Sequence, residues 1–282
     1  MFVVHRLGII GLLLAVLLAS NVSATPIYAS INNDGLHLAT VDSTTGTLSS
    51  VIGLDSTITA LAFAPDGRLF AALNLGFELV TVDPVTGAFS NPVSVDNGID
   101  AMAFASDGQL HAAVGNGGLT LVTVNTTTGG FSDAVSADNG ISAMAFAQDG
   151  RLFASVGSAK LTLVIVDLAT GAFSNSHALD NGIDAMAFAP DGTLYAAIGL
   201  GGLHLVTVDS STGGFSNNLA LDSGIKAMAI MPAAAMPIPE PSTFLLLCIA
   251  LTAIRLGRRK TLCDLLKARR CTTLRPDVAR GA

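Results

Sequence analysis

The sequence DNGIDAMAFA decides the fold, because it occurs at residues 96–105 and again without change at 180–189. Close variants stand at three further places: DSTITALAFA at 55–64, DNGISAMAFA at 138–147 and DSGIKAMAIM at 222–231. Neighbouring copies are 41 or 42 residues apart. A period near 40 residues is typical of a four-stranded propeller blade. The central part of the chain is therefore one structural unit repeated several times.

Turn signals divide each repeat into four short apolar runs. The second repeat predicts strands over 58–64, 69–74, 78–83 and 88–95. An Asp-Gly pair follows the first run of each full repeat, and a Thr-Gly pair precedes each fourth run. Both pairs favour tight turns, because glycine adopts positive φ without steric cost. No stretch of the repeats has a helical period, so the sequence indicates an all-β fold.

The number of strands predicts how the fold closes. Three strands, over 27–31, 36–42 and 47–53, precede four complete repeats, and a single strand over 225–231 follows them. These twenty strands make five blades if the last strand joins the first three. We therefore predict an all-β, five-bladed β-propeller over 25–232, closed by pairing of the C-terminal strand with the first blade. The alternative is an open stack of β repeats, whose ends would not need to complement each other.

The repeat resembles the NHL and lactonase-like propeller repeats of secreted bacterial proteins. The resemblance rests on AFAPDGRLFAA at 62–72, which joins the first two strands of a blade, and on LVTVDPVTG at 79–87, which covers the third. It spans the whole body of the chain and implies a propeller fold. It does not imply a particular ligand, because one fold carries many functions.

Aromatic residues recur at the period of the blade. They lie on the first strand of a repeat at Phe63, Phe104, Phe146 and Phe188, and on the second strand at Tyr28, Phe70, Phe153 and Tyr195. His111 takes the second-strand position in one repeat. We interpret these aromatic residues as packing between blades rather than as a binding platform.

The charge and cysteine content narrow the possible functions. Residues 25–232 contain four basic and eighteen acidic side chains, and such an acidic surface argues against binding nucleic acid. The three cysteines, Cys248, Cys263 and Cys271, all lie near the C-terminus. The predicted propeller can therefore hold neither a disulfide nor a cysteine-based metal site.

One group of acidic residues suggests a site. Asp55, Asp96, Asp138, Asp180 and Asp222 each begin the connection between one blade and the next. We expect these connections on the same face as the turns between second and third strands, so the five carboxylates would surround one mouth of the axial channel, with Asp100 and Asp184 adding to them. Clustered carboxylates suit Ca²⁺. The alternative is that Asp-Asn-Gly is favourable turn chemistry and no cofactor binds.

Catalytic motifs do not stand out. The five histidines form no metal-ligand spacing, and no G-x-S-x-G motif is present. Catalysis needs different residues in different blades, whereas these blades are nearly identical. We therefore expect a non-enzyme, and we retain as an alternative a metal-dependent hydrolase or lactonase acting at the channel mouth.

The N-terminus has the pattern of a secretory signal peptide. His5 and Arg6 precede an apolar run over 7–19, and VSA at 22–24 has small residues where signal peptidase cleaves. We predict a signal peptide over 1–24 with cleavage before Thr25. The Sec machinery and signal peptidase are then expected partners.

The C-terminus combines a Pro-Glu-Pro motif, a short apolar run and a basic cluster. After a linker over 233–238, PEPST is followed by TFLLLCIALTAI at 243–254 and by arginines and a lysine. A helix of twelve residues spans about 18 Å, less than the roughly 30 Å of a bilayer's hydrocarbon, even if it continues to Gly257. The basic end would stay in the cytoplasm.

This pattern resembles the PEP-CTERM sorting signal of exosortase substrates, here over 239–260. The matching residues are Pro239, Glu240, Pro241, Ser242, Thr243, Arg255, Arg258, Arg259 and Lys260. The resemblance implies export from a Gram-negative bacterium through an inner-membrane intermediate, cleavage by exosortase, and delivery to the cell surface or the exopolysaccharide matrix. Family members end soon after the basic cluster, whereas this chain continues as a basic tail over 261–282, which we expect to be disordered.

These observations together predict an exported, non-catalytic propeller with a structural or binding role, for which exopolysaccharide or surface proteins are candidate partners. A protein that keeps its apolar segment and stays anchored in the periplasm is the remaining alternative.

Overall fold

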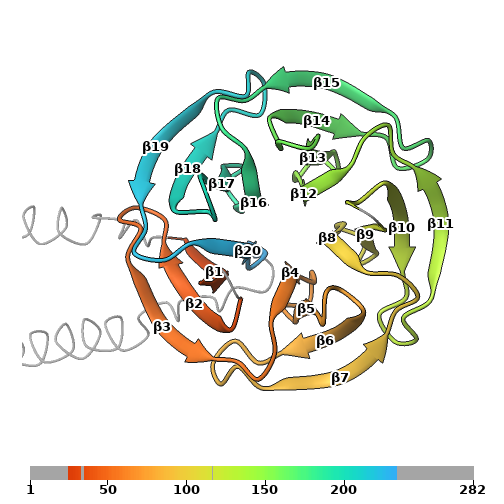
Figure 1. Cartoon of the computed structure of the whole chain (residues 1–282), viewed down its shortest axis with the longest axis horizontal. Helices are drawn as coiled ribbons and strands as arrows, with labels where there is room; N and C mark the ends of the chain where they lie inside the picture. Colours follow the sequence, from red (N-terminus) through yellow and green to blue (C-terminus); the bar gives the residue numbers. More distant parts are fainter. Residues whose placement is uncertain (1–24, 33–34, 116, 234–282) are drawn as a thin grey trace, which may run out of the picture. The chain divides into compact units, whose positions relative to one another are not determined.

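A computed structural model shows twenty antiparallel strands arranged as five four-stranded blades (Figure 1). The structure describes residues 25–32, 35–115 and 117–233. The predicted signal peptide and sorting signal lie outside these residues. The contacts between residues divide the chain into two compact units, Met1–Met236 and Pro237–Ala282, and every described residue belongs to the first unit.

The blades follow one another along the chain, and each runs from the axis outward. The five innermost strands are β20 (Ile225–Ile230), β4 (Ile58–Phe63), β8 (Ile99–Phe104), β12 (Ile141–Phe146) and β16 (Ile183–Phe188). The second strands are β1 (Pro26–Ile31), β5 (Leu69–Leu73), β9 (Leu110–Val114), β13 (Leu152–Val156) and β17 (Leu194–Ile198).

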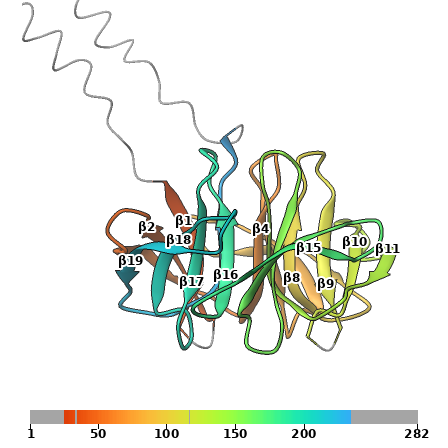
Figure 2. The same ribbon diagram turned by 90° about the horizontal axis from the view of Figure 1, so that it is seen from above.

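The two outer layers complete the blades. The third strands are β2 (His37–Asp42), β6 (Glu78–Val82), β10 (Thr120–Val124), β14 (Thr162–Val166) and β18 (His204–Val208). The outermost strands are β3 (Leu48–Gly53), β7 (Phe89–Ser94), β11 (Phe131–Ser136), β15 (Phe173–Ala178) and β19 (Phe215–Ala220). Figure 1 shows the outermost strands running along the circumference, and Figure 2 shows the innermost strands β4, β8 and β16 running along the axis.

The first blade confirms the predicted closure. Its strand order is β20-β1-β2-β3, so the last strand of the propeller pairs with the first. Ile27 lies opposite Ile230 and Ala29 opposite Met228 in this antiparallel pair. All five sheets have four strands, which agrees with the predicted closed propeller and not with an open stack. Closure protects the inner sheet edges from pairing with other chains.

Burial falls from the axis to the rim in every blade. All five residues of β5, β9 and β13 are buried, whereas four of the six residues in each outermost strand are exposed. The second strands are mostly apolar, apart from Ser30, His111 and Ser155, because both of their faces are covered by neighbouring blades. Four outermost strands begin Phe-Ser-Asn or Phe-Ser-Asp and β3 begins Leu-Ser-Ser, and in all five only the first and fifth residues are half-buried.

The core consists of five clusters, each formed between two neighbouring blades. Aromatic rings meet there across the blade boundary, with ring centroids 5.1–5.5 Å apart in the pairs Tyr28–Phe63, Phe70–Phe104, His111–Phe146 and Phe153–Phe188. The interpretation of the recurring aromatic residues as packing between blades is confirmed. Such pairs add about 0.5–1.5 kcal/mol each beyond the area they bury.

The turns explain the sequence signals. In the turn between β6 and β7, the Asp83 carboxylate accepts hydrogen bonds from the N–H groups of Val85 and Thr86 at 2.8 and 3.2 Å. Gly87 then takes φ +75°, a conformation that costs a side-chain-bearing residue roughly 1–2 kcal/mol. Where the chain passes between blades, the Ile99 N–H donates to the Gly76 carbonyl at 3.1 Å. This bond places the two kinds of connection on one face, as predicted.

Candidate functional site

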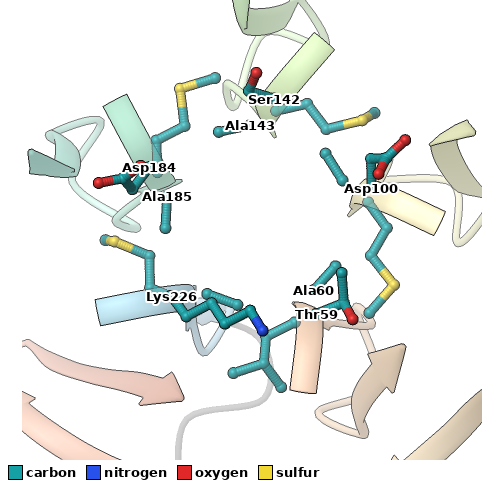
Figure 3. Close-up of a pocket in the computed structure, with 15 residues that line it drawn as sticks. Thr59, Ala60, Asp100, Ser142, Ala143, Asp184, Ala185 and Lys226 are labelled. Carbon is teal, nitrogen blue, oxygen red and sulfur yellow. The ribbon is translucent and has the colours of Figure 1, made fainter. Parts of the chain in front are cut away.

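The innermost strands carry one irregular residue each, and these five residues meet at one mouth of the axial channel (Figure 3). In each innermost pair the register skips the second residue of the inner strand. The skipped residues are Thr59, Asp100, Ser142, Asp184 and Lys226. A β-bulge re-aims a side chain and is frequent beside functional sites. We name these five residues the bulge ring.

The bulge ring is the place where otherwise similar blades differ in chemistry. Every blade has an isoleucine before this position and an alanine after it, but the position itself holds two acids, one lysine and two hydroxyl groups. Figure 3 shows Ala60, Ala143 and Ala185 around the central opening, while the carboxylate oxygens of Asp100 and Asp184 point away from it. The space at the axis is about 30 Å³, which is enough for one water molecule.

The two acids of the bulge ring have different surroundings. Partial burial raises the pKa of the Asp100 carboxyl, and hydrogen bonds from the backbone of Gly118 and Gly117 oppose this rise. Asp184 instead accepts a hydrogen bond from the Lys160 ammonium at 2.6 Å. Asn32, Lys160, Asp184 and Lys226 also line a neighbouring cavity of about 150 Å³. One side of this mouth therefore carries two ammonium groups and the Asp184 carboxylate, and Asp100 is the acid of the bulge ring on the other side.

Lys160 occupies an unusual backbone position. Its φ is +58°, and glycine takes this position at Gly35, Gly76, Gly118 and Gly202 in the other four blades. A side chain here costs roughly 1–2 kcal/mol of backbone strain. In the fourth blade this strained residue, Lys160, forms the ion pair with Asp184, which links the fourth blade to the fifth.

The opposite mouth of the channel is a wider, apolar cavity of about 420 Å³. Its wall is formed by the last residues of the innermost strands, including the four recurring phenylalanines and Ile230. Leu61, Met102, Met144, Met186 and Met228 line this cavity and the bulge-ring mouth alike. Each of the five is only 4% exposed and packs between two blades, beside the narrow part of the channel that separates the two mouths. We call this narrow part the floor of the apolar cavity.

The outer rim repeats a third arrangement, which we name the rim clusters. A threonine of the third strand and a serine of the outermost strand share a hydrogen bond of 2.7 Å between hydroxyl groups in the pairs Thr40–Ser49, Thr81–Ser90 and Thr207–Ser216. Asn91 and Asn217 donate to the threonine hydroxyls from the side at 3.0 and 3.1 Å. These asparagines have φ near +50°, which asparagine tolerates better than most residues.

The five aspartates predicted around the channel mouth are all exposed, but none of them lines it. They lie farther out, in the connections between blades. Asp138, for example, accepts a hydrogen bond from the N–H of Phe173 at the start of an outermost strand, at 3.0 Å. Of the acids named in the sequence, only Asp100 and Asp184 reach the mouth. Within the described ranges no three His, Cys, Asp or Glu side chains form a group that could hold a metal ion.

The histidines are dispersed over the propeller. His37 contacts Asn32, and His204 contacts Asn218, each at 2.8 Å between side chains at the surface. His111 is 8% exposed and packs against Phe146. Burial lowers the pKa of His111, against the charges of Asp107 and Asp133. This histidine therefore behaves as a core aromatic residue.

Sequence reasoning missed Lys160, Lys226, Thr59 and Ser142, and it missed the apolar cavity. A signal for the bulge ring was present, because its residues are the variable letter in DNGIxAMAFA. The cavity had no such signal, since the phenylalanines that line it also pack between blades.

The predicted sorting residues, from Pro239 to Lys260, lie outside the described residues. In the part of the chain that the structure describes, no helix is long and apolar enough to cross a membrane.

Comparison with known proteins leaves the family open. No protein-family model matches the sequence, and no curated protein matches it. Many solved structures resemble the chain, among them the following three. A protein of unknown function from Bacteroides caccae is 13% identical, with a TM-score of 0.46, over 70% of this chain and 73% of that one. The glutaminyl cyclase of Myxococcus xanthus is 15% identical, with a TM-score of 0.48, over 57% and 77%.

The third is the hydrazine synthase of Kuenenia stuttgartiensis, which is 16% identical with a TM-score of 0.44, over 68% of this chain and 63% of that one. Likeness at this level carries no argument about what the present chain binds or catalyses.

Proposed function

We propose that this protein is an exported, non-catalytic β-propeller that binds a polyhydroxylated polymer, such as exopolysaccharide, at the cell surface or in the extracellular matrix. The observation that carries the proposal is the rim clusters. The same uncharged hydroxyl pair stands at the same place on the first, second and fifth blades, with its serine exposed and its threonine half-buried. Hydroxyl and amide groups both donate and accept hydrogen bonds, as the hydroxyl groups of a sugar do.

Repetition supports binding to a polymer rather than to a small ligand. A single exposed hydroxyl cluster competes with water and gains little. Several clusters on one rigid rim convert later contacts into intramolecular ones, which raises avidity by about 10²–10⁴ over a single contact. A polysaccharide chain offers the matching repeat of hydroxyl groups.

Non-catalytic binding also agrees with the likeness of the blades. A catalytic site needs a few different groups converging on one reacting atom. The competing function, a metal-dependent hydrolase or lactonase, would need ligands converging at a mouth, and Asp100 and Asp184 point away from the axis. We therefore do not favour it.

Delivery to the surface is the second half of the proposal. The sequence supports export by the Sec machinery, removal of 1–24 by signal peptidase, and processing at Pro239-Glu240-Pro241 by an exosortase. Retention of the apolar segment in the inner membrane is the alternative. Mass spectrometry of the protein from its native host distinguishes the two, because a mature chain that ends before residue 244 supports sorting and an intact C-terminus in the membrane fraction contradicts it.

The rim clusters can be tested on the full chain with a triple variant. Thr40→Val, Thr81→Val and Thr207→Val remove the hydroxyl groups and keep the shape, and Ile165 already provides an apolar side chain at the equivalent place in the fourth blade. Sedimentation with the host's purified exopolysaccharide should show apparent affinity falling with each substitution, by about ten-fold or more in the triple variant.

The matched control is Thr162→Val on β14, a threonine outside the rim clusters. It should bind as the unmodified chain does. Unchanged binding by the triple variant, with an unchanged melting temperature, would rule out the rim as the binding surface.

A further inference from the structure

We propose that the wide mouth of the axial channel is a binding site for the aliphatic chain of a neutral amphiphile. This site is separate from the rim clusters, so it stands or falls independently of polymer binding. Its volume of about 420 Å³ lies in the range of small-molecule sites, about 300–1,000 Å³. The four phenylalanines at 63, 104, 146 and 188 surround it.

The chemistry of the wall selects an uncharged, apolar group. Among the described residues that line this cavity there is no Asp, Glu, Lys, Arg or His, and within that set only Ser106 and Gln148, at the rim, have side chains with nitrogen or oxygen atoms. Gln148 donates a hydrogen bond to the Pro190 carbonyl across neighbouring turns, so its amide is already engaged. Transferring a charged or strongly polar group into this wall would leave it without partners, at a high cost in free energy.

The floor selects a chain that ends inside the cavity. The channel narrows from this cavity to a space of only about 30 Å³ at the bulge-ring mouth, and Leu61 and the methionines at 102, 144, 186 and 228 line both spaces. Methionine side chains are flexible and adapt to the group that packs on them. A ligand therefore enters from one side only, and its length inside the protein is limited by the depth of the cavity.

The turns beyond the rim select a neutral head group over an anionic one. Directly after the rim residues, each turn carries an exposed aspartate: Asp66, Asp107, Asp149 or Asp191. Asp66 and Asp149 form ion pairs with Arg68 and Arg151 at 2.8 and 2.7 Å. Asp107 and Asp191 instead accept hydrogen bonds from the N–H groups of Gln109 and Thr193. The described turns at this mouth therefore carry a net negative charge, which repels the carboxylate of a free fatty acid.

The experiment titrates the full chain with the neutral fluorescent probe N-phenyl-1-naphthylamine and displaces it with 1-alkanols from hexanol to dodecanol. We expect one saturable site. Affinity should rise about four-fold for each added methylene and then stop rising when the chain reaches the floor. Decanoate should bind about ten-fold more weakly than decanol.

Two variants locate the site. Ala105→Phe and Ala147→Phe each place a ring at a half-buried position that lines the cavity, where the equivalent residue of the first blade is the larger Met231. Ala134→Phe puts the same ring on the exposed outermost strand β11 as the matched control. The apolar segments outside the described residues are the same in all these chains, so their contribution cancels.

Loss of the displaceable signal in either filling variant, with retention in Ala134→Phe and comparable melting temperatures, supports the proposal. The proposal is overturned if both folded filling variants bind the probe as the control does. It is equally overturned if affinity rises through dodecanol without a limit, which indicates partition into a surface, or if no saturable site exists.

Discussion

The third and fourth blades, β8–β11 and β12–β15, have strands of equal length and the same register, yet they solve three local problems differently. The second strand carries His111 in the third blade and Phe153 in the fourth. The turn before the third strand has Gly118 in one and Lys160 in the other. The turn after it begins with Asn125 in one and Asp167 in the other.

The comparison teaches where a propeller repeat tolerates change. A side chain that packs on an aromatic neighbour, or that hydrogen-bonds within its own turn, can be replaced by one of similar shape. A position where the backbone of the next blade approaches closely accepts a side chain only with backbone strain, as at Lys160 with φ +58°, and a substitution there should cost more stability. Substitutions at Gly118, His111 and Asp167 should therefore have large, intermediate and small effects on stability, respectively.

The largest effect is expected at Gly118. Its φ is +72°, and an added Cβ would lie 2.2 Å from the Ile141 carbonyl oxygen of the fourth blade. Gly118→Ala should destabilise the chain by about 3 kcal/mol, since strain and a backbone clash add. Thermal unfolding of the full chain, followed by circular dichroism, should show a melting temperature about 6–12 °C lower.

Two controls separate strain from the clash. Gly108→Ala has the same positive φ, at +87°, with no atom within 4 Å of the added Cβ, and should cost only about 1 kcal/mol. Lys160→Gly relieves strain but loses the half-exposed ion pair with Asp184, worth about 0–1 kcal/mol, so it should be nearly neutral. If Gly118→Ala is no worse than Gly108→Ala, the close approach of the blades is not the cause.

An intermediate effect is expected at His111. Because burial lowers the pKa of this histidine, the folded state favours the neutral ring. The stability that the neutral ring contributes is fully present above the pKa of histidine in the unfolded chain, about 6.5. It falls as the pH drops below that value. His111→Phe should raise stability by about 1 kcal/mol at pH 8, or about 2–4 °C, and by more at pH 5.

The reciprocal variant Phe153→His tests the same idea in the fourth blade. It should destabilise the chain, and more so at pH 5 than at pH 8, because a buried neutral histidine must be charged on unfolding. If His111→Phe raises stability equally at pH 5 and pH 8, the pKa of His111 does not differ between the folded and unfolded states.

The smallest effect is expected at Asp167. Hydrogen bonds from Thr170 and from the backbone of Ala169 hold the pKa of this carboxyl below its usual value. Asn125 accepts the equivalent bonds from Thr127 and Thr128 at 2.9 and 3.0 Å without a charge. Asp167→Asn should therefore change the melting temperature very little at pH 7.

The melting temperatures of chains with aspartate and with asparagine at this turn position should differ in acid. The contribution of a carboxylate with a lowered pKa is present above its unfolded pKa and is lost as the pH falls through the folded pKa. At pH 3 the Asp167→Asn variant should then melt above the unmodified chain, and Asn125→Asp should melt below it. Parallel melting curves of the variant and the unmodified chain from pH 7 to pH 3 would contradict this account.

The strands and their closure could be predicted from the sequence because both depend on local and repeated signals. Glycine and aspartate mark each turn through backbone preferences that act within four residues. The predicted ranges 58–64, 69–74 and 78–83 agree with β4, β5 and β6 to within one residue. The orphan strands at the two ends then allow only one pairing that completes five blades.

The candidate sites could be predicted only in part. Asp100 and Asp184 were expected near a channel mouth and do line it, whereas Asp55 and its four equivalents do not. The error arose because a connection between blades covers the distance from rim to axis, and sequence position alone does not say where along that path a residue lies. Lys226 and Thr59 stand at the variable position of the repeat, but the sequence does not show that a β-bulge brings this position to the mouth.

The sequence by itself determined the repeat, the number of strands and the pairing of the two chain ends, because a hydrophobic period and turn chemistry are properties of neighbouring residues. Tertiary structure decided which side chains meet. Residues about forty positions apart become neighbours only when the blades converge on an axis, and a phenylalanine that packs between two blades also becomes the wall of a cavity. This role as a cavity wall depends on the distance of the five innermost strands from the axis. The sequence of a single repeat does not specify that distance.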